Sequence, residues 1–307
     1  MIRVGTRASI LALAQARSVA AALVGVAGVE VMPMRTEGDR LAEARLAVVG
    51  GKGLFVREIE EALLRGEIDL AVHSLKDLPA EPPAGLVLAA FPAREDPRDV
   101  LVTRAPDSLD TLPPGTRVGT SSPRRRALVL ASRPDLAVEP IRGNVDTRLR
   151  KLATGDWGAI VLAAAGLRRL GLTPAHAVAL DPDVFVPAVG QGIIAVEARA
   201  DDRATLALLA RADDAATRAC ALAERAYLAR LGASCNTPMA AHARLDGRTL
   251  RMSAVVASED GRQVLRANAT APAADAERLG LGLAETLLAQ GAADITALNP
   301  EPGIRSR

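Results

Sequence analysis

Residues 117–170 read RVGTSSPRRRALVLASRPDLAVEPIRGNVDTRLRKLATGDWGAIVLAAAGLRRL, and this stretch decides the fold class. Short apolar runs alternate there with longer runs that have the period of a helix. The pattern predicts strands at residues 117–119, 137–140 and 159–162 and helices at residues 123–131, 145–152 and 163–170. Because strands that alternate with helices form layered units, we expect a parallel sheet covered by helices.

The same alternation fills the beginning of the chain. It predicts strands at residues 2–5, 29–34, 70–73 and 86–91, helices at residues 10–23 and 54–64, and a mobile loop at residues 36–51. Residues 92–99, with two prolines and five charges, are interpreted as a crossover between domains, and residues 186–192 as a second one. Residues 193–197 predict a strand that returns to the first unit. Two lobes joined by two crossings enclose a cleft, where ligands bind.

These patterns divide the chain into three parts. Residues 1–93 and 193–212 form the first α/β lobe, and residues 98–187 form the second. The remainder, residues 213–307, predicts a small α+β domain with helices at residues 215–231 and 274–288 and strands near residues 240–245, 249–257 and 263–269. The expected fold class is therefore α/β: two lobes like those of periplasmic binding proteins, plus a C-terminal α+β domain.

The composition excludes several classes of protein. With 49% hydrophobic and 24% charged residues among 307, the chain is not disordered, and it has no uncharged apolar run of about 18 residues that would span a membrane. A net charge of +2 and 2% aromatic residues argue against a general nucleic-acid binder. We interpret residues 18–29 as a buried helix rather than a signal peptide, and expect a cytoplasmic protein. Two cysteines and three scattered histidines predict no metal site.

Three predicted strand-to-helix turns have the composition of anion sites. In residues 119–126 (GTSSPRRR), hydroxyl groups precede a proline at the first helical position, which leaves backbone N–H groups open to an anion. Residues 141–148 (IRGNVDTR) and 5–9 (GTRAS) repeat this arrangement. Capping and a solvated surface explain any one of them. Three in two facing lobes favour a cleft for several carboxylates or phosphates, which arginine holds with its planar fork.

Residues 73–79 (HSLKDLP) put Lys76 and Asp77 at the end of a buried strand. A carboxylate in a cationic cleft stays ionised, and it suits the stabilisation of a developing cation or the passage of a proton. The alternative is that Asp77 only caps the turn before Pro79. We expect His73 to be a packed structural histidine.

The two cysteines have different surroundings in the sequence. Cys220 lies among apolar residues of a predicted helix and is expected in the core. Cys235 lies in a loop of small residues, LGASCNTP at residues 231–238, where a thiol is reachable and suits a nucleophile or an attachment point.

Together these motifs resemble the porphobilinogen deaminase (hydroxymethylbilane synthase) family. The resemblance runs from Arg3 to about Leu288, and its motifs are specific in their order and spacing. They are GTRAS at 5–9, GGKGLFVREIE at 50–60, DLAVHSLKDLP at 69–79, EDPRD at 95–99, VGTSSPRR at 118–125, IRGNVDTRLRKL at 141–152, AAAGLRRLGL at 163–172, VPAVGQG at 186–192 and SCNTP at 234–238.

The resemblance implies a transferase of tetrapyrrole and heme biosynthesis. Such an enzyme joins four porphobilinogen molecules head to tail, with loss of ammonia, and releases hydroxymethylbilane. The resemblance implies a dipyrromethane cofactor held by a thioether to Cys235, and Asp77 as the catalytic aspartate that assists ammonia loss and stabilises pyrrole-derived cations. It also implies a cytoplasmic monomer whose partner is the small molecule porphobilinogen, with no nucleic acid, membrane or metal.

The resemblance further implies which residues hold the acetate and propionate groups of cofactor and substrate. These are Arg7, Ser9, Lys76, Thr120, Ser121, Ser122, Arg124, Arg125, Arg142, Arg148 and Arg169. Lys52 and Phe55 match the border of a flexible loop over the cleft. Because each porphobilinogen brings two carboxylates, the growing product is a polyanion that suits many guanidinium groups.

The chain departs from the family pattern near two of these motifs. Ala233 and Ser234 stand where many relatives have two glycines, Asn236 replaces a glutamine or arginine, and Val48 replaces a frequent lysine. The alternative function is a non-catalytic two-lobe receptor for anions, because a fold does not fix a function. That alternative gives Cys235 no role. A nucleic-acid binder based on residues 124–126 is favoured less still, because the net charge is near neutral and aromatic residues are few.

Overall fold

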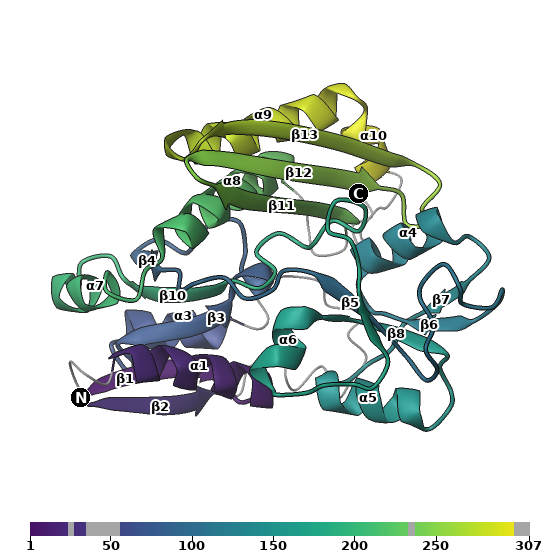
Figure 1. Ribbon diagram of the computed structural model, residues 1–307. Helices are drawn as coiled ribbons and strands as arrows, with labels where there is room; N and C mark the ends of the chain where they lie inside the picture. The colour runs from purple at the N-terminus through teal and green to yellow at the C-terminus, as the bar shows by residue number, and fades with distance from the viewer. Residues whose placement is uncertain (24–27, 35–55, 233–236, 298–307) are drawn as a thin grey trace, which may run out of the picture.

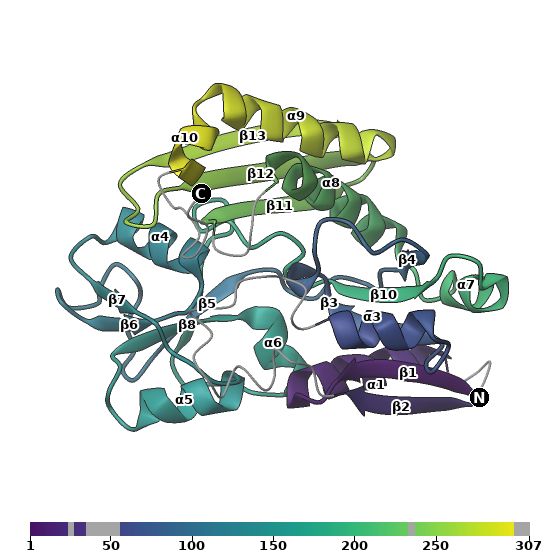
Figure 2. The same cartoon turned by 180° about the vertical axis from the view of Figure 1, so that it is seen from behind.

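The computed structural model describes residues 1–23, 28–34, 56–232 and 237–297. Within these ranges the chain forms two mixed sheets, one in each α/β lobe, and an antiparallel sheet in a third domain. The two lobes lie side by side, and the third domain lies across both of them (Figures 1 and 2). The fold class expected from the sequence is confirmed.

The sheet of the first lobe has the strand order β2-β1-β3-β10-β4. Apolar residues of alternate strand positions face α1 on one side, where Val4 and Val196 pack against Val19, and α3 on the other, where Ala71 packs against Leu63. The elements are β1 (Ile2–Arg7), α1 (Ile10–Leu23), β2 (Val29–Met34), α3 (Arg57–Leu64), β3 (Leu70–Ser74), the 3-10 turn η2 (Leu75–Asp77), β4 (Leu86–Ala90), β10 (Ile194–Arg199) and α7 (Arg203–Leu209).

The sheet of the second lobe has the strand order β7-β6-β8-β5-β9. Leu128 of α4 packs against one face of it, and Leu152 and Leu167 of α5 and α6 pack against the other. The elements are β5 (Asp99–Thr103), β6 (Arg117–Gly119), α4 (Pro123–Ser132), β7 (Ala137–Glu139), α5 (Val145–Ala153), β8 (Ala159–Ala163), α6 (Ala164–Arg169) and β9 (Ala177–Ala179).

The expected parallel pairing holds for part of each sheet, and both sheets are mixed. β1 runs parallel to β2 and β3, but β10 runs antiparallel to β3 and β4. In the second lobe β6 runs parallel to β7 and β8, whereas β5, a strand absent from the predictions, runs antiparallel to β8. The cause is the same in both lobes: β5 and β10 each follow a crossover, so each enters its sheet from the other lobe.

The third domain packs its two long helices on one face of a meander. Tyr227 of α8 and Leu283 of α9 pack against Ala241 and Met252. Gly280 is required where α9 crosses α8, because a Cβ there would overlap the backbone of Ala223. The elements are α8 (Ala215–Leu231), β11 (Met239–Asp246), β12 (Thr249–Ala257), β13 (Val264–Pro272), the 3-10 turn η3 (Ala273–Asp275), α9 (Ala276–Ala289) and α10 (Ala292–Ala297).

A buried carboxylate on α8 joins the three parts. Glu224 pairs with Arg94 of the first crossover at 2.7 Å, and it accepts hydrogen bonds from the N–H groups of Gly190, in the second crossover, and of Ala243, in β11. Arg94 also donates to the carbonyl oxygen of Gln191. We propose the domain boundaries predicted above, residues 1–93 with 193–212, 98–187 and 213–307, since both crossovers meet at this junction. Among the described residues, no helix has the length and apolar character needed to cross a membrane.

Candidate functional site

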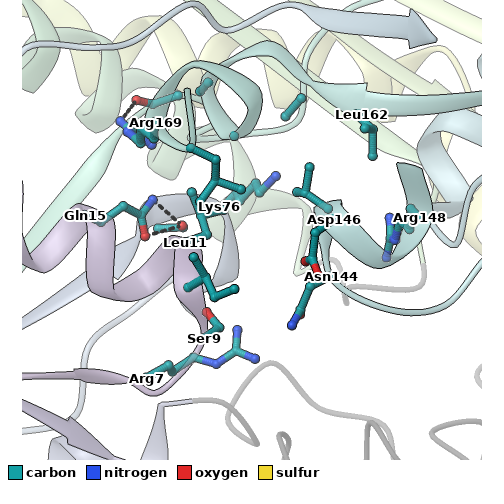
Figure 3. Close-up of a pocket in the computed structure, with 18 of the residues that line it drawn as sticks. Arg7, Ser9, Leu11, Gln15, Lys76, Asn144, Asp146, Arg148, Leu162 and Arg169 are labelled. Atoms are coloured by element: carbon teal, nitrogen blue, oxygen red, sulfur yellow. Dashed lines mark hydrogen bonds between the residues drawn. The ribbon is translucent and has the colours of Figure 1, made fainter. Parts of the chain in front are cut away.

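A cavity of about 200 Å³ lies between the two α/β lobes. Figure 3 shows Arg7, the last residue of β1, and Ser9, just before α1, on one side and Asp146 and Arg148 of α5 on the other, with Lys76 between them. The basic residues that line this cavity are Arg7, Lys76, Arg125, Arg148 and Arg169. Since Asp146 is the one carboxylate in the described lining, the cavity has a positive charge excess that suits a ligand with several carboxylates.

A second cavity, of about 290 Å³, continues the first toward the third domain. Lys76 and Arg125 line both cavities, and Asp77 lines the second together with Thr237, which precedes β11. The other polar residues of the second cavity are Ser121, Ser122, Arg124 and Gln191. The two cavities therefore form one cleft, to which both lobes, the second crossover and the third domain contribute.

The turn η2 places Lys76 and Asp77 at the junction of the two cavities. Leu75 and Leu78 are buried on either side of them and anchor the turn, and the N–H of Leu75 donates to the carbonyl of Ile193. Gly190 lies directly against this turn with a φ of +73°, and a Cβ there would come within 2.8 Å of Leu75. Burial lowers the pKa of the Lys76 ammonium to about 8, although the Asp77 carboxylate opposes that shift.

The turn at the start of α4 has the capping predicted from its sequence. The Ser122 hydroxyl accepts the N–H of Arg125 as N-cap, and Pro123 follows it at the first position of the helix. Ser121 donates to the carbonyl of Ile141 at 2.6 Å, so it joins this turn to the next one. Thr120 is buried and its hydroxyl accepts the N–H of Ser122. Ser121 and Ser122 line the second cavity, whereas Thr120 supports the turn from within.

Arg124 and Arg125 share one buried carboxylate, that of Asp99 at the start of β5. Arg124 Nη1 lies 2.6 Å from Asp99 Oδ2, and Arg125 Nη2 lies 2.7 Å from Oδ1. Burial alone would raise the pKa of Asp99, but the two guanidinium groups lower it below its usual range. Two cations on one anion leave a net positive charge at the wall of the cleft.

Two groups that line the second cavity lack a hydrogen-bond partner among the described residues. The Nε of Arg124 is a buried donor, and the Oε1 of Gln191 is a buried acceptor. The Gln191 amide is oriented by its Nε2, which donates to Asp99 and to the carbonyl of Pro97. Because buried polar groups are normally paired, these atoms favour a ligand that carries both an anionic acceptor and an N–H donor.

Arg148 and Arg169 line the first cavity from α5 and α6. Arg148 donates to the carbonyl of Gly143, and Arg169 donates to the carbonyl of Gly192 (Figure 3). Burial lowers the pKa of Arg148 to about 10, with a further contribution from the charge of Arg125, and burial also lowers the pKa of Arg169. Both guanidinium groups are therefore poorly solvated, and a bound carboxylate would compensate for that loss.

Comparison with known proteins decides the family. Residues 2–207 match the model described as porphobilinogen deaminase, dipyromethane cofactor binding domain, and residues 218–289 match porphobilinogen deaminase, C-terminal domain. The chain belongs to the porphobilinogen deaminase family.

Curated relatives match over nearly the whole chain. The porphobilinogen deaminase of Syntrophotalea carbinolica is 50% identical over 98% of this chain and 98% of its own length. Those of Brevibacillus brevis and Acidithiobacillus ferrooxidans are 49% and 52% identical over 96% of each chain. Among solved structures, the periplasmic VFT2 domain of Bordetella pertussis BvgS matches 69% of this chain and 86% of its own, at 16% identity and a TM-score of 0.42. The porphobilinogen deaminase match does not favour the alternative of a non-catalytic receptor.

The structure brings most of the residues implied by the porphobilinogen deaminase resemblance to the cleft. Two of the described ones, Arg142 and Thr120, line neither cavity. Arg142 is exposed and its carbonyl accepts a hydrogen bond from Lys151, whereas Thr120 is buried. Cys235, Lys52 and Phe55 lie outside the described residues, as do Val48, Ala233, Ser234 and Asn236. Cys220 is buried in the third domain, and burial raises the pKa of its thiol to about 11.

Sequence reasoning missed several residues of the cleft. Gln15 of α1 exchanges hydrogen bonds with Ser74 at 2.8 and 3.2 Å, and both line the first cavity. Asn144 and Asp146 line it from the start of α5. Asp146 and Gln191 lie inside motifs that the sequence already singled out, IRGNVDTR and VGQG, so those motifs pointed to them.

Proposed function

We propose that this chain is an enzyme, a porphobilinogen deaminase, which joins four porphobilinogen molecules head to tail with loss of ammonia and releases hydroxymethylbilane. The observation that carries the proposal is the cleft itself, in which five basic side chains line the first cavity and Asp77 adjoins it at η2. A product with two carboxylates per ring requires many cations, whereas the reacting centre requires one carboxylate. The family match supports the same reaction.

The residues of the second cavity fit a dipyrromethane group. Arg124 offers a buried donor without a partner among the described residues, Gln191 offers an acceptor, and Lys76, Ser121 and Ser122 add polar groups around them. Carboxylates and pyrrole N–H groups are the counterparts that such a set binds. When bound, this group supplies the pyrrole carbon to which porphobilinogen is added.

We propose Cys235 as the residue that holds this group through a thioether. The support comes from the chain on either side of it. Thr237 lines the second cavity, and two peptide units, which span about 7 Å at most, separate it from Cys235. Cys220 is buried in the core, so it is unsuited to attachment.

Asp77 is proposed as the catalytic carboxylate. As ammonia leaves the aminomethyl group of porphobilinogen, positive charge develops on the substrate, and a carboxylate beside it stabilises that charge. The same carboxylate is placed to accept a proton and return it. Arg7, Arg148 and Arg169 hold and orient carboxylates in the first cavity, while Ser9 lies at the start of α1 and adds a hydroxyl. Lys52 and Phe55 are proposed to border a loop over the cleft.

The finer parts of the proposal follow from the family. We propose a cytoplasmic monomer that acts on a small molecule and binds neither nucleic acid nor membrane.

The purified protein incubated with porphobilinogen tests the whole proposal. We expect release of ammonia and hydroxymethylbilane in a ratio of about four to one, the ratio that the joining of four rings requires. Porphobilinogen that is bound but not consumed would contradict the proposal and would favour a receptor.

A further inference from the structure

Three ionisable side chains lie together behind the cleft, on the face of the first sheet that α3 covers. Glu60 lies on α3, His73 on β3 and Glu197 on β10. His73 pairs in register with Ala195, so Glu197 is its diagonal neighbour on the same face of the sheet. His73 Nε2 lies 3.2 Å from Glu197 Oε2. We call these three residues the buried triad.

The buried triad is almost completely removed from solvent and is not satisfied by hydrogen bonds. Glu197 is 0% exposed, His73 5% and Glu60 8%. Both oxygens of Glu197, the Nε2 of His73 and the Oε1 of Glu60 make no aligned hydrogen bond with any described residue. An unpaired buried carboxylate is costly, and the charge of Glu197 acts on Glu60, so a proton on Glu60 lowers that cost.

The charges around the triad favour a shared proton. Burial and the negative charge of Glu197 raise the pKa of Glu60 to about 7, although His73 opposes the shift. Arg225 of α8 faces Glu197, but its guanidinium donates to the carbonyl oxygens of Pro79 and Ala80. Arg199, two residues after Glu197 on β10, donates to carbonyls of Leu63 and Ile68 and to Asp202. Neither arginine neutralises the triad.

The triad also adjoins the catalytic cleft. His73 and Asp77 both line a third cavity, of about 50 Å³, together with Arg7, Ser9 and Ser74. A cavity of that size has room for water, and its polar lining groups can hold water that links groups that do not touch. His73 thus borders the cavity of Asp77 on one side and the carboxylate of Glu197 on the other.

We propose that Glu60, His73 and Glu197 form a buried proton-binding site, in which the two carboxylates share one proton and His73 connects them with the cavity beside Asp77. With one proton between them, the carboxylates of Glu60 and Glu197 together carry one negative charge. They can therefore accept a further proton when Asp77 gives one up. That proton moves from Asp77 through water to His73 and then to the pair, and it returns by the same route. Only O–H and N–H bonds exchange along this path, so no oxidant or co-reactant is consumed. The three residues are positioning residues, since they act through Asp77.

The pH dependence of turnover tests this inference, which in its kinetic part depends on the proposed function. We expect the kcat of the unmodified enzyme to change with pH as a group with a pKa near 7 ionises. In Glu60→Gln that ionisation should disappear from the profile, because the carboxyl group whose pKa is raised to about 7 is no longer present. The KM should stay within about twofold, since Glu60 lines none of the three cavities described above. Glu61→Gln, which removes the neighbouring exposed acid of α3, is the matched control and should keep the original profile.

Infrared spectroscopy gives a second readout that requires no turnover, and its first part uses the unmodified protein alone. The unmodified protein should show the carbonyl stretching band of a protonated carboxylic acid that disappears as the pH rises through about 7. Glu61→Gln should retain this band, and Glu60→Gln should lose it. Absence of such a band from the unmodified protein, or an unchanged kcat profile in folded Glu60→Gln, would overturn the inference. If the band is present but porphobilinogen is not consumed, the proposed function fails and the proton site stands.

Discussion

Asp99 accepts hydrogen bonds from both the Nε and the Nη2 of Arg125, at 2.9 and 2.7 Å, and so holds that guanidinium against the cleft. The same carboxylate binds Arg124 on its other oxygen. Asp99 lines neither cavity, yet it orients Arg124 and Arg125, two of the residues expected to bind the ligand. Its position at the start of β5, directly after a crossover, also ties the wall of the cleft to the junction between the lobes.

Asp99→Asn should destabilise the fold, because it leaves two buried guanidinium groups without their charged partner. We expect a loss of about 3–5 kcal/mol in the free energy of unfolding, measured by urea denaturation. Asp135→Asn breaks a partly exposed pair with Arg133 and serves as the control, with an expected loss below about 1 kcal/mol. Equal losses in the two variants would show that the Asp99 cluster does not support the fold.

Asp77→Asn should abolish turnover and leave the fold intact. The amide keeps the shape of the side chain but removes the charge and the proton acceptor, so we expect kcat to fall about 100- to 10,000-fold. Initial rates of hydroxymethylbilane release measure the effect, and the melting temperature checks the fold. Glu81→Gln, a nearby exposed acid, should retain its activity. A rate for Asp77→Asn within threefold of the unmodified rate, roughly 0.6 kcal/mol, would remove Asp77 from the mechanism.

Cys235→Ser should lose a covalently attached group. Intact-protein mass spectrometry should give the unmodified enzyme a mass above the 31.9 kDa of its sequence by one dipyrromethane, and give Cys235→Ser the mass of the bare chain. Cys220→Ala is the control and should keep the added mass, because that thiol is buried in the third domain. An active enzyme with the bare mass would contradict covalent attachment.

The affinity for porphobilinogen should fall as the pH rises above about 8, the pKa to which burial lowers Lys76. A bound carboxylate favours the charged ammonium, so binding is strongest below this pKa and weakens above it, by at most about tenfold per pH unit. The dissociation constant measured from pH 6 to 10 in Asp77→Asn, whose turnover is slow, reports this dependence. In that variant the fall should begin at a lower pH than in the unmodified enzyme, because the Asp77 carboxylate no longer raises the pKa of Lys76. Adding Lys76→Arg keeps the charge at every pH in that range and should flatten the curve. The same slope in both proteins would assign the titration to another group.

Arg148→Gln should weaken ligand binding more than Arg142→Gln. Arg148 is poorly solvated and lines the first cavity, whereas Arg142 is exposed. Loss of one charge-assisted hydrogen bond of about 1.5–3 kcal/mol predicts a rise in KM of roughly 10- to 150-fold for Arg148→Gln. If Arg142→Gln gives the larger effect, the ligand extends beyond the cavities described here.

Many helices and strands could be predicted from the sequence, because their bounds depend on residues that are close together in the chain. The bounds of α1, α8 and β12 were predicted to the residue, and the Ser122-Pro123 cap was read from its composition. β5 and β9 were missed. β5 begins with Asp99, a charged residue that normally marks a loop, and only its pairing with Arg124 and Arg125 lets it lie in a core.

The sequence predicted the positive charge of the site, but not which arginines pair with protein groups and which are left for a ligand. Arginines in three turns indicated a cationic cleft, and both cavities have such walls. Which arginines are held by protein partners depends on contacts between distant segments, such as that of Asp99 with Arg125, which are 26 residues apart. The pairing of Gln15 with Ser74 across 59 residues was hidden for the same reason.

The return of the chain to the first lobe at β10 has a consequence for biosynthesis. β10 lies between β3 and β4 in the first sheet, so β4 has no neighbour in that sheet until residue 199 has left the ribosome. By then the whole second lobe has already been synthesised. The nascent chain therefore completes its inserted lobe before its first one, and until then the edge of β3 is open to a chaperone.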